Sequence, residues 1–263
     1  MSDDARVALV TGAARGIGAA TVHRLAHADY QVVAVDACAD DQALAYAMGT
    51  RDELDAVVAP YGVQAIAVTA DVRDQAAVQR AVEQAVHTFG GLDAVVAGAG
   101  VMAGGQPLWE TSDATWDVLH DVCLRGVFHV VRAAVPALLA RPAPRQGRLV
   151  AIASSAAHGG LYHLAAYNSA KSAVVGLVRG LACDLRGTGV TAIAVSPGST
   201  RTAMLTATAA VYGLDDVEAF ADSQQTERLA EPDEVAAAIA WLCSPDASAV
   251  TGSVLHPDGG FTA

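Results

Sequence analysis

Seven short, almost wholly apolar runs alternate with longer segments of helical pattern along this chain of 263 residues. Strands with an apolar side chain at nearly every position are typical of parallel sheets, because helices cover both faces. The intervening segments, for example 74–89, are long enough for crossover helices. The alternation predicts one α/β domain over residues 1–263, a doubly wound parallel sheet with helices on both faces. The predicted strands are 6–11, 31–36, 65–70, 93–97, 148–153, 191–196 and 252–256.

Composition argues against several function classes. Hydrophobic residues make up 53% of the chain, enough for a sizeable core, and the formal net charge is −12. An acidic chain without a Lys/Arg-rich run is a poor partner for nucleic acid. We find no apolar run of membrane-spanning length, and the opening MSDDARVALV does not resemble a signal peptide, so a cytoplasmic protein is expected. The scattered cysteines predict neither a disulfide nor a metal site.

Two segments are longer than a minimal connection. Residues 37–64 follow the second predicted strand, and residues 199–230 follow the sixth. Extra chain at the carboxyl ends of parallel strands usually builds the ligand site. We expect the first segment to border a cofactor and the second to cover a substrate. Apolar residues of the second segment could form a lid or simply pack a helix: Met204, Leu205, Tyr212 and Phe220.

A glycine-rich turn, TGAARGIG at 11–18, joins the first predicted strand to a helix. Glycine allows tight turns and close backbone approach, and a helix N-terminus offers free N–H groups to a pyrophosphate. Asp36 closes the second strand, where a carboxylate can accept hydrogen bonds from both hydroxyls of an adenosine ribose and would repel a 2′-phosphate. NAD is therefore favoured over NADP, although Arg15 could meet such a phosphate. Asp71 is placed to reach the adenine, or to cap the next helix, for which Asp74 is the better candidate.

The segment AAYNSAK at 165–171 places Tyr167 and Lys171 one helical turn apart among small residues. Such a pair suggests a phenol made more acidic by a neighbouring ammonium group. A tyrosine acting as a base near neutral pH needs its pKa lowered by roughly 2–3 units. A cation about 4 Å away supplies on the order of 4 kcal/mol at an effective dielectric constant near 20, so one lysine is roughly sufficient.

These motifs, together with SPGSTRT at 196–202 and VTGSVLHPDGG at 250–260, resemble the short-chain dehydrogenase/reductase family over essentially the whole chain. The resemblance implies a Rossmann-type fold and an NAD-dependent enzyme that interconverts a secondary alcohol and a ketone. It implies a catalytic group of Ser154, Tyr167 and Lys171, with the adjacent Ser155 as the weaker alternative to Ser154. The cofactor-binding residues that it implies are Gly12, Arg15, Gly16, Ile17, Gly18, Asp36, Asp71, Val72, Gly98, Gly100, Lys171, Pro197, Gly198, Thr200 and Thr202.

Two positions depart from the family pattern. Cys123 stands where the family usually has an asparagine that helps to hold a water in the proton relay. A thiol is a weak donor and acceptor, so the relay could be slowed unless backbone groups hold the water. Gly98 stands where the family commonly has an asparagine side chain beside the cofactor. These departures keep open a non-catalytic, NAD-binding regulatory protein of the same fold.

The long segment 37–64 resembles the mycofactocin-coupled branch of the family. In that branch such a segment is thought to hold the nicotinamide cofactor through many turnovers while an external redox peptide recycles it. The alternatives are a freely exchanging dehydrogenase and a 3-oxoacyl reductase. The family is often tetrameric, so a homotetramer is expected. Four further residues could border the substrate pocket or be plain loop and packing residues: Trp109, His158, Tyr162 and His163.

Overall fold

The computed structural model describes residues 5–263 and contains one sheet of seven parallel strands in the order β3-β2-β1-β4-β5-β6-β7. This confirms the predicted fold class. Residues 1–4, on which the expectation of no signal peptide partly rests, lie outside the described residues. The strands are β1 Val7–Thr11, β2 Gln31–Asp36, β3 Ala65–Thr69, β4 Ala94–Ala97, β5 Arg148–Ile152, β6 Thr191–Val195 and β7 Val254–Leu255.

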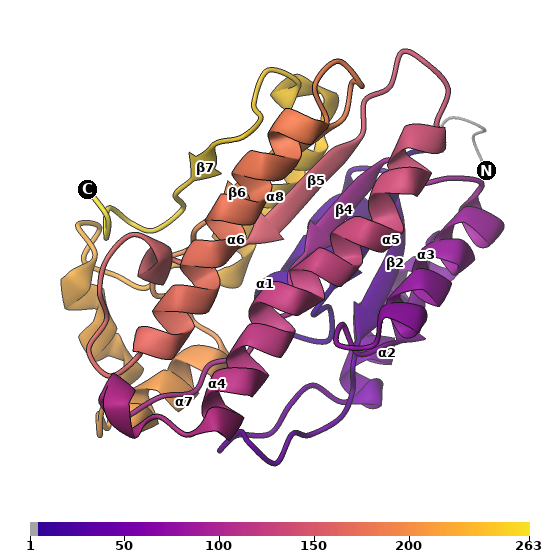
Figure 1. Cartoon of the computed structure of the whole chain (residues 1–263). Coiled ribbons are helices and arrows are strands. Elements are labelled where there is room, and N and C mark those ends of the chain that lie inside the picture. Colours follow the sequence, from indigo (N-terminus) through magenta and orange to yellow (C-terminus); the bar gives the residue numbers. More distant parts are fainter. Residues whose placement is uncertain (1–4) are drawn as a thin grey trace.

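Helices cover both faces of the sheet (Figure 1). Apolar side chains of α3, α5 and α6 form one buried core on one face. Those of α1, α2 and α8 form a second core on the other. The α-helices are α1 Gly16–His27, α2 Arg51–Val58, α3 Gln75–Phe89, α4 Asp113–His120, α5 Gly126–Ala140, α6 Ala165–Asp184, α7 Ala203–Val211 and α8 Pro232–Cys243.

The strand order reverses beside β1, which pairs with β2 on one side and with β4 on the other. Connections from the carboxyl ends of β1 and β4 therefore leave in opposite directions and open a crevice between them. Thr11, the last residue of β1, pairs with Val35 of β2 and Ala97 of β4. The glycine-rich turn and the segment after β4 consequently meet at this crevice.

Predicted and observed elements differ mainly at the ends. α3 begins after Asp74, whose side chain accepts hydrogen bonds from the N–H groups of Ala76 and Ala77, as predicted for a capping residue. The last strand has only two residues instead of the five predicted over 252–256, and Gly252, at the predicted start, has a φ of +66° and is not extended. Residues 37–50 contain no regular helix or strand and precede α2.

The helical stretch Asp113–Ala140 is continuous through α4, a π-helical turn and α5, and it is long and apolar enough to cross a membrane. This corrects the expectation that the sequence holds no apolar run of that length. Core helices of soluble proteins meet the same criteria. Here α5 contributes Val127, Val130 and Leu138 to the core on the sheet.

Candidate active site

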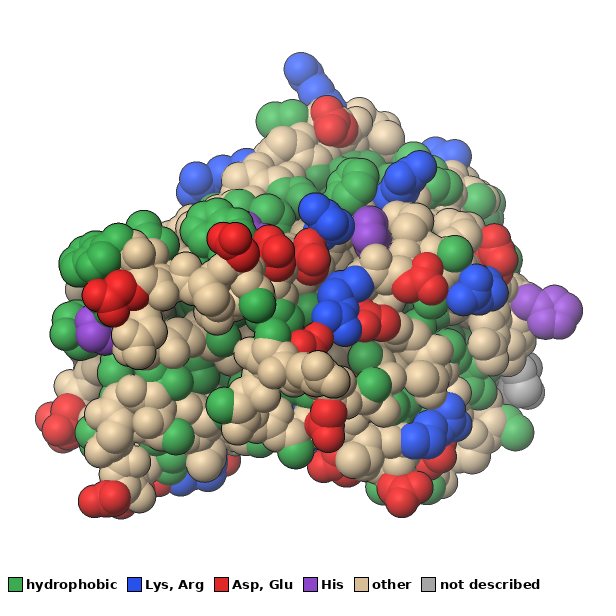
Figure 2. Space-filling model, turned by 60° about the horizontal axis from the view of Figure 1, so that its bottom comes forward, with side chains coloured by type: hydrophobic (Ala, Val, Ile, Leu, Met, Phe, Trp, Pro, Cys, Tyr) green, Lys and Arg blue, Asp and Glu red, His purple; other side chains and the backbone are tan. Residues whose placement is uncertain are grey.

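A cavity of about 780 Å³ opens at the carboxyl ends of the strands. Figure 2 looks onto this hollowed side of the molecule, where acidic and basic side chains lie beside apolar ones. Every residue predicted for the site lines this one cavity, so the fold brings together segments far apart in sequence. They are Gly12, Arg15, Gly16, Ile17, Gly18, Asp36, Asp71, Val72, Gly98, Gly100, Ser154, Tyr167, Lys171, Pro197, Gly198, Thr200 and Thr202.

One position in the turn between β1 and α1 and one in the first turn of α1 have room only for glycine. Gly12 has a φ of +71°, and a Cβ there would lie 2.8 Å from the Cα of Ala99. A Cβ at Gly18 would lie 1.9 Å from the carbonyl oxygen of Gly12. The N-cap residue of α1 is Arg15, whose side chain makes no capping hydrogen bond. The first N–H groups of α1 therefore remain available to an anion such as a pyrophosphate.

The acidic and basic residues near the glycine turn are oriented by their neighbours. Asp36 accepts hydrogen bonds from the N–H groups of Ala14 (3.0 Å) and Cys38 (3.2 Å), which leaves lone pairs on both of its oxygens for ribose hydroxyls. The guanidinium group of Arg15 donates to the carbonyl oxygen of Ala47, in the segment after β2. Arg15 is thus engaged by a backbone carbonyl of the protein instead of being free to bind a 2′-phosphate, and Asp36 favours NAD over NADP.

Asp71 lines the same end of the cavity, but its carboxylate is already paired. Arg73 lies 2.6 Å from it and also pairs with Asp41 at 2.6 Å. Burial raises the pKa of Asp71, but hydrogen bonds from Arg73 outweigh this and lower it overall. The carboxylate therefore stays charged. Arg73 also ties the strand end after β3 to the segment after β2.

The segment 37–50 crosses from the end of β2 to the segment after β4, and we call it the strap. The hydroxyl of Tyr46 accepts a hydrogen bond from the N–H of Met102 at 3.0 Å. Burial raises the pKa of Tyr46 to about 12, so this phenol stays protonated near neutral pH. Tyr46 lines the cavity, although sequence reasoning missed it. The motif ACADDQALAY pointed to the segment but not to this residue.

The three predicted catalytic residues come from two elements. Tyr167 and Lys171 lie on the first turns of α6 and are 8% and 4% exposed. Ser154 follows β5, and its hydroxyl accepts a hydrogen bond from the N–H of Ala156. Packing against small residues therefore buries a phenol and an ammonium group side by side at the cavity wall.

The electrostatics of the phenol differ from the sequence-based expectation. Burial raises the pKa of Tyr167, while a hydrogen bond with Ser154 opposes this. Lys171 donates to the carbonyl oxygen of Ile152 at 2.9 Å, and its Nζ lies 5.9 Å from the centre of the Tyr167 ring. The prediction that the lysine alone lowers this pKa is wrong for the protein by itself, because the cost of burial outweighs the distant cation.

Cys123 lies in a π-helical turn, Asp121–Arg125, between α4 and α5. Its thiol accepts from the N–H of Val101 at 3.4 Å and donates to the carbonyl oxygen of the same residue at 3.3 Å. π-turns inside helices are frequent at functional sites. The buried thiol therefore fixes the segment after β4, and it does not line the cavity.

The glycine at position 98 also has a local explanation. The N–H groups of Gly98 and Ala99 donate to the Thr11 hydroxyl at 3.1 and 3.2 Å. A Cβ at Gly98 would lie 2.8 Å from the carbonyl oxygen of Thr11. This close contact between the ends of β1 and β4 suits a glycine. The hydroxyl of Thr11 anchors the sheet beside the cavity without help from a side chain at position 98.

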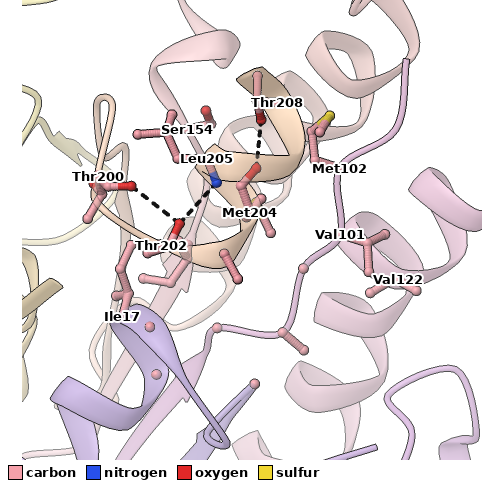
Figure 3. A pocket seen from close by; sticks show the side chains of 18 of the residues that line it. Ile17, Val101, Met102, Val122, Ser154, Thr200, Thr202, Met204, Leu205 and Thr208 are labelled. Atoms are coloured by element: carbon pink, nitrogen blue, oxygen red, sulfur yellow. Dashed lines mark hydrogen bonds between the residues drawn. The ribbon is translucent and has the colours of Figure 1, made fainter. Parts of the chain in front are cut away.

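The other end of the cavity is apolar. Figure 3 shows Met102, from the segment after β4, and Met204, Leu205 and Thr208 of α7 around the cavity that Ser154 borders. The predicted lid residues Met204, Leu205, Tyr212 and Phe220 all line the cavity.

Four other residues considered for the pocket do not line it. Trp109 and Tyr162 are 84% and 73% exposed. His158 forms a hydrogen bond with Ser196 at 2.9 Å, and His163 stacks on Tyr162. The hydroxyl of Tyr212 donates to the carbonyl oxygen of Tyr162, which links the segment after α7 to the loop before α6.

A glycine cradle, a ribose-binding carboxylate and a buried Tyr–Lys pair in one cavity define a dinucleotide-dependent oxidoreductase site. A family model described as enoyl-(acyl carrier protein) reductase matches residues 12–262. The chain belongs to the short-chain dehydrogenase/reductase family.

Three similar proteins cover nearly the whole chain. An A-factor type gamma-butyrolactone 1'-reductase (1S-forming) from Streptomyces virginiae is 38% identical over 98% of this chain and 95% of its own. A (-)-trans-carveol dehydrogenase from Rhodococcus erythropolis is 34% identical over 98% of both chains. The crystal structure of carveol dehydrogenase from Mycobacterium avium in complex with NAD has a TM-score of 0.92 and 29% identity over 99% of both chains.

Proposed function

We propose that this protein is an NAD-dependent dehydrogenase that interconverts a neutral, apolar secondary alcohol and its ketone. The observation that carries the proposal is the convergence of Ser154, Tyr167 and Lys171 with the glycine turn and Asp36 in one cavity. The carveol dehydrogenase relatives support this substrate class. Cys123 and Gly98, the reasons for considering a non-catalytic protein, are explained by their contacts with Val101 and Thr11.

In this proposal, NAD supplies the acceptor for the hydride when it is bound. Tyr167 takes the proton from the alcohol hydroxyl, and Ser154 donates a hydrogen bond to the substrate oxygen. Lys171, which donates to the carbonyl oxygen of Ile152, would also hold the ribose hydroxyls of bound NAD, and its positive charge would favour the deprotonated phenol. The carbon–hydrogen bond breaks as the carbonyl forms, so one alcohol yields one ketone, one hydride and one proton.

The substrate end of the cavity supports a neutral alcohol. Its wall after β4 and along α7 consists of Met102, Met204, Leu205 and other uncharged residues. The nearby Arg201 pairs with Glu218 and with Glu231 at 2.9 Å, so its charge is compensated. A substrate carboxylate or phosphate bound against this wall would lose its hydration, and no unpaired cation of the wall would compensate for that loss.

Replacement of Tyr167 by Phe tests the proposal. Loss of the phenol removes the proton acceptor, and general bases typically contribute about 10²- to 10⁴-fold, so kcat for a cyclic secondary alcohol should fall by at least about 10². NAD binding, followed by fluorescence titration, should remain within about threefold of wild type because the glycine turn is untouched. Full activity in Tyr167→Phe would refute the assigned chemistry.

We further propose that the strap retains NAD through many turnovers and that mycofactocin recycles the cofactor in place. The strap is held at Asp41 by Arg73 and, further along, at the adjacent residues Tyr46 and Ala47 by the N–H of Met102 and the guanidinium group of Arg15. A cover of this kind slows release without altering hydride transfer. The alternatives are a freely exchanging dehydrogenase and a 3-oxoacyl reductase.

Mixing the protein with excess NAD and alcohol separates these readings. Under the captive-cofactor proposal, absorbance of reduced nicotinamide should stop at about one equivalent per subunit. It should continue only when an artificial electron acceptor or mycofactocin is added. Accumulation far beyond the protein concentration would show free exchange and exclude retention. We also propose that the protein is a cytoplasmic homotetramer.

A further inference from the structure

A second cavity, of about 770 Å³, lies at the opposite, amino-terminal end of β5 and β6. Its wall comes from the segment before β5, the last turns of α6, the loop before β6, the first residues of β5 and β6, and the segment between α8 and β7. No Asp or Glu of the described residues lines it. Its charged lining consists of Arg145, Arg148, Arg179 and Arg186. The cavity therefore concentrates positive charge on a protein with a net charge of −12.

This concentration of arginines is unusual within the chain. Eight arginines of the described residues lie within 4.0 Å of a carboxylate. Seven arginines have no carboxylate within that distance, and four of these seven line this cavity. A fifth, Arg15, lines the NAD cavity. The seven are Arg6, Arg15, Arg132, Arg145, Arg148, Arg179 and Arg186.

Arg148 distinguishes this cavity from a solvated surface patch. It is 2% exposed, and its guanidinium group donates only to the carbonyl oxygens of Gly147, Ser244 and Pro245. Burial and the nearby charge of Arg6 lower the pKa of Arg148. A guanidinium group has five N–H donors, so two are left after these three bonds. A buried cation without a carboxylate is costly, and an anion in the cavity would offset that cost.

We propose that this cavity binds a small polyanion that carries phosphate groups, of pyrophosphate size or larger. Guanidinium groups bind phosphate oxygens through paired hydrogen bonds, and four of them require a ligand of high charge density. A cavity of this volume is in the usual range for small-molecule sites, which is larger than a single ion needs. It lies at the other end of the strands from the NAD cavity, so both ligands can bind together.

Calorimetric titration of pyrophosphate into the NAD-saturated protein tests this proposal, because bound NAD occupies the glycine turn. We expect one equivalent to bind, with an affinity that falls as salt is raised. The double variant Arg179→Gln/Arg186→Gln changes two exposed side chains of the cavity and should weaken binding at least tenfold. Arg132→Gln, an exposed and unpaired arginine on α5, is the matched control and should change affinity less than twofold.

Equal melting temperatures of the three proteins without pyrophosphate would show that the variants fold normally. Absence of binding to the NAD-saturated protein would overturn the proposal, since all binding would then belong to the glycine turn. An equal loss of affinity in Arg132→Gln would also overturn it, because it would indicate general attraction to surface charge. Retained binding in the double variant would place the anion elsewhere.

Discussion

At the scale of single residues, the site depends on close contacts that leave no room for side chains. The approach of Gly18 to the carbonyl oxygen of Gly12 brings α1 against the turn that precedes it. The same residue type has no such role at Gly176 in α6, where a Cβ would meet nothing within 4 Å. The cofactor site therefore requires glycine at position 18, whereas it places no such requirement on position 176.

Gly18→Ala should abolish measurable NAD binding, because its Cβ would lie 1.9 Å from a backbone oxygen and the turn must open. Gly176→Ala is the matched control. It should leave NAD affinity unchanged and raise the free energy of unfolding by about 0.5–1 kcal/mol, since alanine is the better helix former. Fluorescence titration and urea unfolding measure the two quantities. If Gly18→Ala bound NAD as tightly as the wild type, the glycine-rich turn would not be the cofactor-binding element.

The pH dependence of activity follows from Tyr167. Its pKa is raised by burial, and the deprotonated phenol is the form that accepts a proton, so kcat/KM for alcohol oxidation should rise with pH into the alkaline range. Ser154→Ala removes the hydrogen bond that lowers this pKa and should move the rise to higher pH. Initial rates between about pH 6 and about pH 10 measure the pH dependence of kcat/KM. Ser155→Ala should leave the position of the rise unchanged, and a shift to lower pH in Ser154→Ala would contradict the assignment.

At the scale of elements, local motifs could be predicted and contacts between distant segments could not. The strands, the glycine turn and the Tyr–Lys pair follow from patterns within a few residues. Tyr46 could not be recognised, because the course of the strap depends on its distant contact with Met102. The role of Cys123 depends in the same way on Val101. The pKa of Tyr167 was mispredicted because the degree of burial is a property of the packed fold.

The strap gives a prediction about exchange of the cofactor. Tyr46→Phe removes only the hydroxyl that accepts from Met102, and NADH should leave at least fivefold faster, as expected for loss of one hydrogen bond worth about 1 kcal/mol. Stopped-flow displacement by excess NAD measures the release rate. Tyr61→Phe, which removes a hydroxyl bonded to His23 on α1, is the control and should not change it. Equal release rates in the wild type and Tyr46→Phe would show that this contact of the strap does not retain the cofactor.

At the scale of the whole molecule, the two ends of the sheet carry different chemistry. The carboxyl ends form the cavity with Asp36 and Tyr167, and the amino ends form the arginine cavity. The helices between them leave large apolar side chains at the surface, including Trp116 at 41% and Phe128 at 47% exposure. Figure 1 shows α4, α5 and α6 together on one face, and this face suits contact with further copies of the chain.

Phe128→Asp should break the proposed homotetramer. Burying a phenylalanine contributes roughly 1.5–3 kcal/mol, and a charge at that position would have to be desolvated in every subunit that uses the contact. Size-exclusion chromatography with light scattering should give about four times the chain mass of 26.7 kDa for wild type and a smaller species for the variant. Val63→Asp, at a position 78% exposed and far along the chain from these helices, should remain tetrameric. A monomeric wild-type protein would exclude this assembly, and a tetrameric Phe128→Asp would place the interface on another face.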